Sequence, residues 1–410
     1  VSQSKAAYWP KLNVSARYTR LSKVESNAVG SGGIVITPDP TPRQIDPAVD
    51  QLFAANLQFL VPVDQYTLNA RLDLPLSDYL LRFSQASGAA KQSRSAAELD
   101  ERATQLSVAR DARTAYYQWV RTQAQVLIAT QGVEQANGHL TDAKNAFQAG
   151  LANRADVLRA EAGLQNAALF EEHAKNASTI AALQVSILMR DEGNKSYEVG
   201  ENLFAELPEL STVPAPDVAY QEALAKRPEL RSMEAAEAAL RQQAKVARAG
   251  NYPRLDAQAN LTYANPNQRY FPQLPEWRYT WDVSAVLSWT PTDIPGAQAA
   301  SSVAEARAAE ISSQRSALRD SLKLEVNQAL QAAGEARFSI VASDHQLRAA
   351  EESYRVRREL YRAGRATTVE VTDAETELTR ARLEAVDARV NARLSLVALN
   401  HALGRDANQR

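Results

Sequence analysis

Hydrophobic and polar residues alternate one by one in four short stretches of the chain. Successive side chains of a β-strand point to opposite faces, so this alternation predicts strands with one apolar and one polar face. Three of the stretches lie near residues 12–18, 66–74 and 255–263. The fourth, YTWDVSAVLSW at 279–289, has the richest apolar set: Tyr279, Trp281, Val283, Ala285, Leu287 and Trp289.

Most of the remaining pattern is helical. Residues 76–207 and 296–410 contain no proline and are rich in Ala, Glu, Arg, Gln and Leu, which favour helices. Helices from about Tyr79 to Phe147 and from about Ala297 to Tyr361 would each be about 100 Å long at the usual rise per residue. Helices of this length need packing partners along their whole length. The pattern therefore predicts long antiparallel helices. Their apolar residues recur at helical spacing, as in Leu383, Val386, Val390, Leu394 and Val397.

Two segments that would join these helices match each other. FQAGLANRADVLRAE at 147–161 aligns without gaps with YRAGRATTVEVTDAE at 361–375. Gly150 and Gly364 suit the left-handed residue that ends a helix. Three residues later, Asn153 and Thr367 can cap the next helix, and Thr367 with Glu370 forms a capping box. Each segment therefore predicts a tight turn between two antiparallel helices.

The match extends to the strands. YWPKLNVSARYTR at 8–20 is similar to NYPRLDAQANLTY at 251–263, so the chain is an internal duplication. The second half opens with a predicted helix at 217–250. The counterpart of that helix would precede Val1, so we expect a further segment before the first residue of this sequence.

The net charge and the lengths of the apolar stretches limit which partners and which kind of membrane insertion we expect. The net charge is −2, which gives no reason to expect a nucleic-acid partner. No stretch approaches the ~20 apolar residues of a transmembrane helix, so any membrane insertion would be by strands. Each alternating stretch has the length of about 9–11 residues of a transmembrane β-strand. Aromatic residues near the strand ends resemble the girdle of an outer-membrane barrel: Tyr18, Tyr66, Tyr263, Tyr279, Trp281 and Trp289.

Two interpretations of these strands remain open at this point. In a soluble protein, each strand would be half of a sheet with its apolar face on a core. In a membrane, open sheet edges are excluded, and four strands are too few to close a barrel. Several copies of the chain would then have to share one barrel.

This ordered set of features resembles the TolC-type outer-membrane efflux factor family. The resemblance covers nearly the whole chain and implies a mainly α fold with a membrane β-barrel. Three copies would share twelve strands, and their long helical hairpins would form a periplasmic α-barrel that tapers to a closed tip. The resemblance also implies a division of the chain into six segments. The first repeat has a strand pair at 9–78 with an external loop at 21–56, a helical hairpin at 79–189 with its tip near 147–157, and an equatorial segment at 190–216. The second repeat has a helix at 217–250, a strand pair at 251–292 and a helical hairpin at 293–405 with its tip near 361–371.

The acids near the two tips have two explanations. From the residues alone, they stabilise helix N-termini through the helix dipole. The resemblance implies instead that Glu370 and Asp373 line the pore constriction. It also implies that Asp156 holds the closed state through Tyr361 and an arginine. The arginine position is Ala366 here, with Arg365 one place earlier, so that clasp departs from the family pattern.

No catalytic constellation is visible. The four histidines form no metal-binding pair, and there is no glycine-rich phosphate loop, so we expect no enzyme, cofactor or metal site. They are His139, His173, His345 and His401, which we interpret as surface or inter-helix residues.

The favoured function is a passive exit duct of a tripartite efflux or type I secretion system, in the outer membrane of a Gram-negative bacterium. The expected partners are two further copies of the chain, outer-membrane lipid, an inner-membrane transporter and a periplasmic adaptor. The adaptor would dock on the tip turns, at Gly150, Leu151, Gly364 and Arg365. The alternative is a soluble, elongated coiled-coil scaffold, and the sequence does not identify the cargo.

Overall fold

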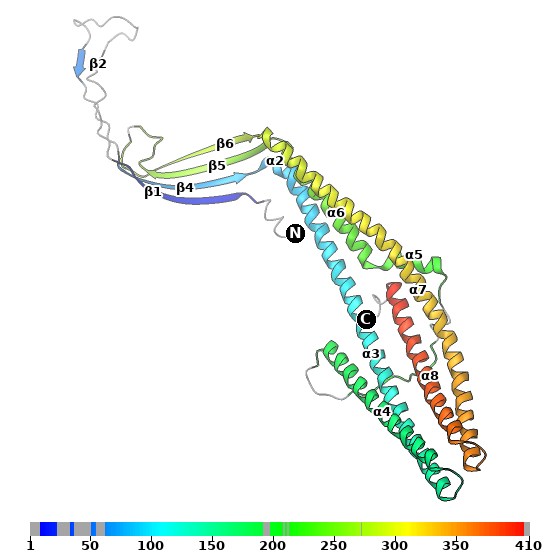
Figure 1. Cartoon of the computed structure of the whole chain (residues 1–410). Helices are drawn as coiled ribbons and strands as arrows, with labels where there is room; N and C mark the ends of the chain where they lie inside the picture. The colour runs from blue at the N-terminus through cyan, green and yellow to red at the C-terminus, as the bar shows by residue number, and fades with distance from the viewer. Residues whose placement is uncertain are drawn as a thin grey trace. The chain divides into compact units, whose positions relative to one another are not determined.

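The computed structural model describes residues 9–22, 33–36, 51–54, 62–191, 197–207, 210, 213–271 and 273–405. The chain divides into two compact units. The first unit comprises residues 1–94 and 236–309, and contains the strands. The second comprises residues 95–235 and 310–410, and is helical. Figure 1 shows the elements of both units, which are described separately below.

The first unit is built on a four-stranded antiparallel sheet (Figure 1). Its strands are β1 (Lys11–Arg20), β4 (Asp64–Leu74), β5 (Arg254–Asn265) and β6 (Arg278–Ser288), in the spatial order β1-β4-β5-β6. All four strands predicted from the alternation are therefore present. Within the predicted external loop, β2 (Gly33–Ile36) pairs with β3 (Gln51–Ala54), and most of that loop lies outside the described residues.

The exposure of the sheet is the reverse of that in a soluble protein. Along β6, Tyr279, Trp281 and Val283 are exposed, whereas Thr280 and Asp282 between them are half-buried. Val283 in mid-strand is 70% exposed. A soluble sheet buries its apolar face on a core. This sheet instead turns the apolar face outward, as a lipid-facing sheet does.

The opposite face of the sheet carries hydrogen-bonded polar residues. Asn69 Nδ2 donates to Thr262 Oγ1 over 3.0 Å, between β4 and β5. Asn260 Nδ2 donates to Asp282 Oδ2 over 2.9 Å, between β5 and β6. On β4, Arg71 Nε donates to Asp73 Oδ1 over 2.8 Å. Polar groups on this face therefore satisfy one another across the strands, which suits a wet interior.

The second unit contains two helical hairpins. The first hairpin pairs the C-terminal part of α3 (Ser84–Gln148) with α4 (Arg154–Met189), and the second pairs that of α7 (Ile294–Arg362) with α8 (Thr368–Ala402) (Figure 1). A single π-helical turn, Tyr79–Phe83, precedes α3. None of the described helices has both the length and the apolar character needed to cross a bilayer.

Small apolar side chains hold these helices together. Ala143 and Ala160 pack between α3 and α4, and Ala350 and Leu378 pack between α7 and α8. A third cluster contains Ile128 of α3 together with Val386 and Val390 of α8, and so joins the two hairpins. Alanine at these positions lets the helix backbones approach closely, which explains why the long helices are alanine-rich.

The predicted single helix at 217–250 is wrong in one respect, because it is broken. The structure has α5 (Pro216–Lys226), then α6 (Pro228–Arg248) and a short 3₁₀ turn at Ala249–Asn251. Pro228 disfavours helical geometry at the preceding residue, and Arg227 is accordingly extended, with φ −66° and ψ 118°. The buried Arg227 guanidinium uses this break. It pairs with Glu325 at 3.0 Å and Glu229 at 3.1 Å, and donates to the carbonyl oxygen of His401 at 3.0 Å.

Candidate functional site at the helical tips

Both hairpins end in the same kind of turn. Gly150 and Gly364 have φ of +75° and +70°, the left-handed region that glycine adopts without strain. After the first glycine, the Leu151 N–H donates to the Ala146 carbonyl over 2.8 Å, and after the second, the Arg365 N–H donates to the Leu360 carbonyl over 2.8 Å. These bonds close the helix ends as in a Schellman motif. The predicted conformation of both glycines is therefore confirmed.

Capping boxes start the helix that follows each turn. Asn153 and Asp156 exchange side-chain and backbone hydrogen bonds of 3.0 and 3.1 Å at the start of α4. Thr367 and Glu370 do the same at the start of α8, where the Thr367 N–H donates to Glu370 Oε2 over 2.8 Å. The box at Thr367 was expected from the sequence. The carboxylate of Asp156 thus has a local partner within its own turn.

Glu370 and Asp373 differ in their surroundings although they lie one helical turn apart. Glu370 forms the capping box and also an ion pair with Arg357 of α7. The Thr367 backbone N–H, its hydroxyl and the Arg357 charge hold the pKa of the Glu370 carboxyl below its usual range. Asp373 is exposed, and its carboxylate accepts no hydrogen bond from any residue that the structure describes. It is therefore the more available of the two carboxylates.

Tyr361 lies in the interior of the tip. Its ring is 8% exposed and packs 5.4 Å from the ring of His139 on α3, measured between centroids. Its hydroxyl lies 3.4 Å from Thr368 Oγ1 at the start of α8. Burial lowers the pKa of His139, which favours the neutral imidazole. Within one chain, Tyr361 therefore contacts His139 and Thr368. Its expected contact with Asp156 would join two copies of the chain and stays a prediction.

A charged contact that the sequence analysis missed joins the two hairpins near the tip. Asp142 Oδ2 of α3 accepts a hydrogen bond from Arg362 Nε of α7 over 3.1 Å. It also lies 3.6 Å from Arg358 Nε, one helical turn earlier on α7. We call these three residues the Asp142 clasp. The one signal in the sequence is the pair of arginines four residues apart, which lie on the same helix face.

Arg365 and Leu151 point outward from the turns. Leu151 is 72% exposed and Arg365 is exposed. An added Cβ at Gly150 or Gly364 would meet open space, so the surface over each turn is free within one chain. The tips therefore offer an accessible apolar side chain, an accessible cation and two glycines.

The predicted aromatic residues are distributed along the apolar face of the sheet. Tyr18 and Tyr66 pair across β1 and β4 with ring centroids 5.0 Å apart, and Tyr263 pairs with Tyr279 across β5 and β6. Trp277, which the sequence analysis did not single out, stacks on Tyr263 at 4.8 Å. Two further tryptophans of the predicted girdle are exposed: Trp281, near the start of β6, and Trp289, which directly follows the last residue of β6.

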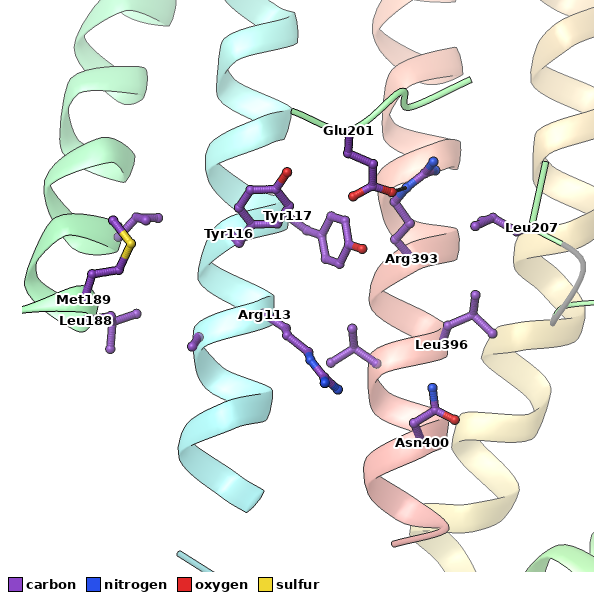
Figure 2. Close-up of a pocket in the computed structure, with 13 residues that line it drawn as sticks. Arg113, Tyr116, Tyr117, Leu188, Met189, Glu201, Leu207, Arg393, Leu396 and Asn400 are labelled. Atoms are coloured by element: carbon purple, nitrogen blue, oxygen red, sulfur yellow. Dashed lines mark hydrogen bonds and ion pairs between the residues drawn. The ribbon is translucent and has the colours of Figure 1, made fainter. Parts of the chain in front are cut away.

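The segment at 190–216, which was expected to be equatorial, contributes Glu201 and Leu207 to the lining of a cavity of about 610 Å³ in the helical unit. Figure 2 shows Glu201 of this segment meeting Arg393 of α8 at the cavity, next to Tyr117. Arg393 is 3% exposed, and its Nε donates to Glu201 Oε1 over 2.6 Å while its Nη2 donates to the Asn202 carbonyl over 2.9 Å. This pair fixes the described part of the segment, which contains no α-helix, to α8.

The described side chains also bear on whether the chain can hold a metal ion. Among the described residues, no group of three His, Cys, Asp or Glu side chains lies close enough to hold a metal ion. His139 and His401, two of the four histidines, are buried between helices. The site consists of turns, capping boxes and ion pairs, which can hold a conformation and bind a partner.

Comparison with known proteins supports the same architecture. A family model described as outer membrane efflux protein matches residues 1–189 and 219–405, and so includes both repeats. Among curated proteins, none matches the sequence.

Several solved structures share the fold. The outer-membrane channel OprN is 20% identical with a TM-score of 0.77, over 98% of this chain and 83% of that one. VceC from Vibrio cholerae is 19% identical with a TM-score of 0.76, over 98% of this chain and 89% of that one. CmeC from Campylobacter jejuni is 16% identical with a TM-score of 0.77, over 100% of this chain and 81% of that one.

These matches confirm the predicted fold class and the predicted resemblance. They favour the outer-membrane channel over the soluble scaffold, in agreement with the outward apolar face of the sheet. The protein is accordingly assigned to the outer membrane, with its helical hairpins in the periplasm. On the strength of the family match over both repeats, the chain belongs to the outer membrane efflux protein family.

Proposed function

We propose that three copies of this chain assemble around one axis and form a passive exit duct, gated at its periplasmic tip. The observation that carries the proposal is the sheet. Its exposed face is apolar, and its outer strands β1 and β6 each have an edge on which no described strand pairs. An unpaired backbone group costs several kcal/mol in lipid, so such edges need partners there. Three copies with four strands each would close a twelve-stranded barrel.

The helical unit supports the same assembly. An apolar stripe on α4 is exposed in the single chain, with Leu158, Leu169 and Ile180 spaced 11 residues apart on one helix face. A second exposed stripe on α7 includes Phe338, which is 76% exposed, and Val341. We propose that the α4 stripe of one copy packs on the α7 stripe of the next copy. Contacts between two different surfaces generate a closed ring when the rotation closes.

We propose that the gate of the duct lies on the three-fold axis of the assembly. Glu370 and Asp373 lie one turn apart on α8, so we propose that they face the axis as two stacked acidic rings. In each copy the Asp142 clasp would hold α7 against α3 in the closed state. Asp156 and Tyr361 have partners within one chain, so their proposed part in closure is to keep the turns in shape. The exposed Arg365 side chain is available to contact a neighbouring copy or a partner protein.

The tips also give the proposed docking site. We assign the periplasmic adaptor to Gly150, Leu151, Gly364 and Arg365, because both turns are exposed and open in one chain. In a three-fold assembly these turns form six similar positions. The adaptor would connect the duct to an inner-membrane transporter, which supplies energy and selects the cargo.

Reconstitution tests the proposal through two adjacent residues of β6. Val283 is on the apolar face and Ser284 on the polar face. Val283→Lys should cost about 2–4 kcal/mol at mid-membrane and abolish channel activity in planar bilayers. Ser284→Lys should keep the channel and change its conductance. The native mass of the detergent-solubilised wild type should correspond to three chains. A soluble single chain without detergent, with equal effects of the two lysines, would contradict the proposal.

A further inference from the structure

A second cavity lies between the two hairpins, away from the tip turns. Its volume is about 450 Å³, within the range of small-molecule sites. Small residues leave this space open on two helices: Gly132 and Ala136 on α3, and Gly163 and Ala167 on α4. Phe170 of α4 and Leu383 of α8 add larger apolar surfaces.

Two polar side chains that line the cavity each have one oxygen without a hydrogen-bond partner. Gln135 Oε1 of α3 and Glu375 Oε1 of α8 are buried, and neither accepts a hydrogen bond. A carboxylate oxygen and an amide oxygen are both acceptors, so they do not satisfy each other. Buried polar groups in native proteins nearly always have partners. While Glu375 is ionised, these two oxygens therefore lack a hydrogen-bond donor.

No described residue forms an ion pair with Glu375, although the Arg358 charge and the Tyr354 hydroxyl lie near its carboxylate. On α8, Arg380 pairs with Glu384 at 2.9 Å. On α7 and α3, Arg358 pairs with Asp142 in the Asp142 clasp, and the neutral Tyr354 of α7 also lies near. The residues of α4 that line the cavity do not titrate: Gly163, Asn166, Ala167 and Phe170.

Protonation of Glu375 agrees with this geometry. Burial raises the pKa of the Glu375 carboxyl to about 7, although the Arg358 charge and the Tyr354 hydroxyl lower it and the Asp142 charge adds to the rise. The carboxyl therefore gains or loses its proton readily near neutral pH. A bound cation would take the place of that proton.

We propose that this cavity binds a small amphipathic amine. Its ammonium group donates hydrogen bonds to Glu375 Oε1 and Gln135 Oε1, and its apolar part lies among Phe170, Leu383 and the small residues of α3 and α4. A charge-assisted hydrogen bond is stronger than a neutral one, so the site prefers an amine to an alcohol of the same shape. The proposed gate residues Glu370, Asp373 and Asp142 do not line the cavity, so the proposed site does not rest on the gate.

Calorimetric titration of the detergent-solubilised assembly tests the site with two matched probes, 2-phenylethylamine and 2-phenylethanol. The amine should bind more tightly than the alcohol. Glu375→Gln should weaken amine binding about tenfold or more and leave the alcohol unchanged. Gly163→Leu should abolish binding of both, because a side chain added at Gly163 enters open space in the cavity and does not clash.

Two matched control variants lie outside the cavity. Glu377→Gln changes an exposed carboxylate two residues from Glu375, and Gly334→Leu changes a glycine of α7 that also has open space around it. Both should bind the amine as the wild type does. The proposal is overturned if the wild type does not bind the amine, if amine and alcohol bind equally, or if Glu375→Gln or Gly163→Leu keeps the wild-type affinity for the amine.

Discussion

Asp142 and Arg362 are 220 residues apart in the sequence, yet Arg362 Nε donates a hydrogen bond to Asp142 Oδ2 over 3.1 Å. The bond joins the last turn of α7 to α3, and so ties the second hairpin to the first. Arg358, one turn earlier, approaches the same carboxylate oxygen at 3.6 Å. One acid thus holds two arginines at the level of the tip. We interpret this clasp as the contact that keeps the two hairpins of each chain together when the gate is closed.

Asp142→Asn should weaken the closed gate. Half-buried and exposed ion pairs contribute about 0.2–1 kcal/mol each, so loss of the carboxylate should raise the open-to-closed ratio only a few-fold. The measurement is the residual conductance of single channels in planar bilayers at low voltage. Asp111→Asn is the matched control, because Asp111 pairs with its neighbour Arg110 on the same helix and joins no hairpins. If the two variants had equal residual conductance, the Asp142 clasp would have no part in closing the gate.

Asp373→Asn should reduce cation selectivity more than Glu370→Gln does. Both acids are proposed to form rings, but Glu370 is already paired with Arg357 and held in the capping box, whereas Asp373 is exposed. A ring of free carboxylates attracts cations to a pore. Reversal potentials under a salt gradient measure the effect. Glu370→Gln should instead lower the thermal stability of the tip. Unchanged selectivity in the double variant would mean that these acids only stabilise helix starts.

Gly364→Val should weaken docking of the adaptor without preventing assembly. The residue has φ +70°, and β-branched side chains strongly disfavour positive φ. The turn must then change shape, which moves Arg365. Site-specific cross-linking to the adaptor measures the loss. Gly334→Val is the control, since Gly334 lies within α7 with open space around it. If Gly364→Val cross-links as well as the wild type, the turns are not the docking site.

The contribution of Glu375 to the stability of the helical unit should fall as the pH rises from about 5 to about 8. The Glu375 carboxyl has a pKa of about 7 in the folded chain, against the ordinary glutamate value of 4.5, so the folded state binds more protons at this group between these limits. Its contribution to stability therefore falls as pH rises through this window, by at most about 3 kcal/mol. Glu222 does not contribute, because Arg405 lowers its pKa to about 2 and it stays ionised throughout.

Thermal unfolding of the wild type and Glu375→Gln at the two ends of this range measures the effect. The variant has no group to titrate at this position but keeps His139 and His401, whose lowered pKa values raise stability as the pH rises. The midpoint of the wild type should therefore fall relative to that of the variant as the pH rises. A wild type and variant with the same pH dependence would show that Glu375 is not the group responsible.

The features that the sequence predicted well depend on local rules. The four strands follow from strict alternation, and the φ values of Gly150 and Gly364 follow from their position at the end of apolar helical repeats. The capping box of Thr367 and Glu370 follows from a spacing of three residues. Each of these needs only neighbouring residues, so each can be identified without knowledge of the fold.

The features that it missed depend on residues far apart in the chain. Asp142 has no local signature, and its partners become evident only when α3 and α7 are side by side. The packing of Tyr361 against His139 also brings together two helices that are far apart in the sequence. The expected contact of Tyr361 with Asp156 would join two copies and stays a prediction. The break at Arg227 had a local signal in the following proline. Alanine-rich helical pattern on both sides outweighed that signal, and the buried partners of Arg227 explain why the break is stable.

Cysteine cross-linking between β1 and β6 tests the shared barrel most directly. The chain contains no cysteine, so introduced pairs report without background. Ser15 of β1 is combined in turn with Asp282, Ser284 and Ser288 of β6, all replaced by cysteine. The control pair is Asn69 of β4 with Thr262 of β5. In one chain, Asn69 Nδ2 and Thr262 Oγ1 lie 3.0 Å apart. On oxidation, at least one β1–β6 pair should give a ladder that ends at three chains, and the control should give single chains. A ladder that continues beyond three, or single chains with every β1–β6 pair, would contradict a barrel closed by three copies.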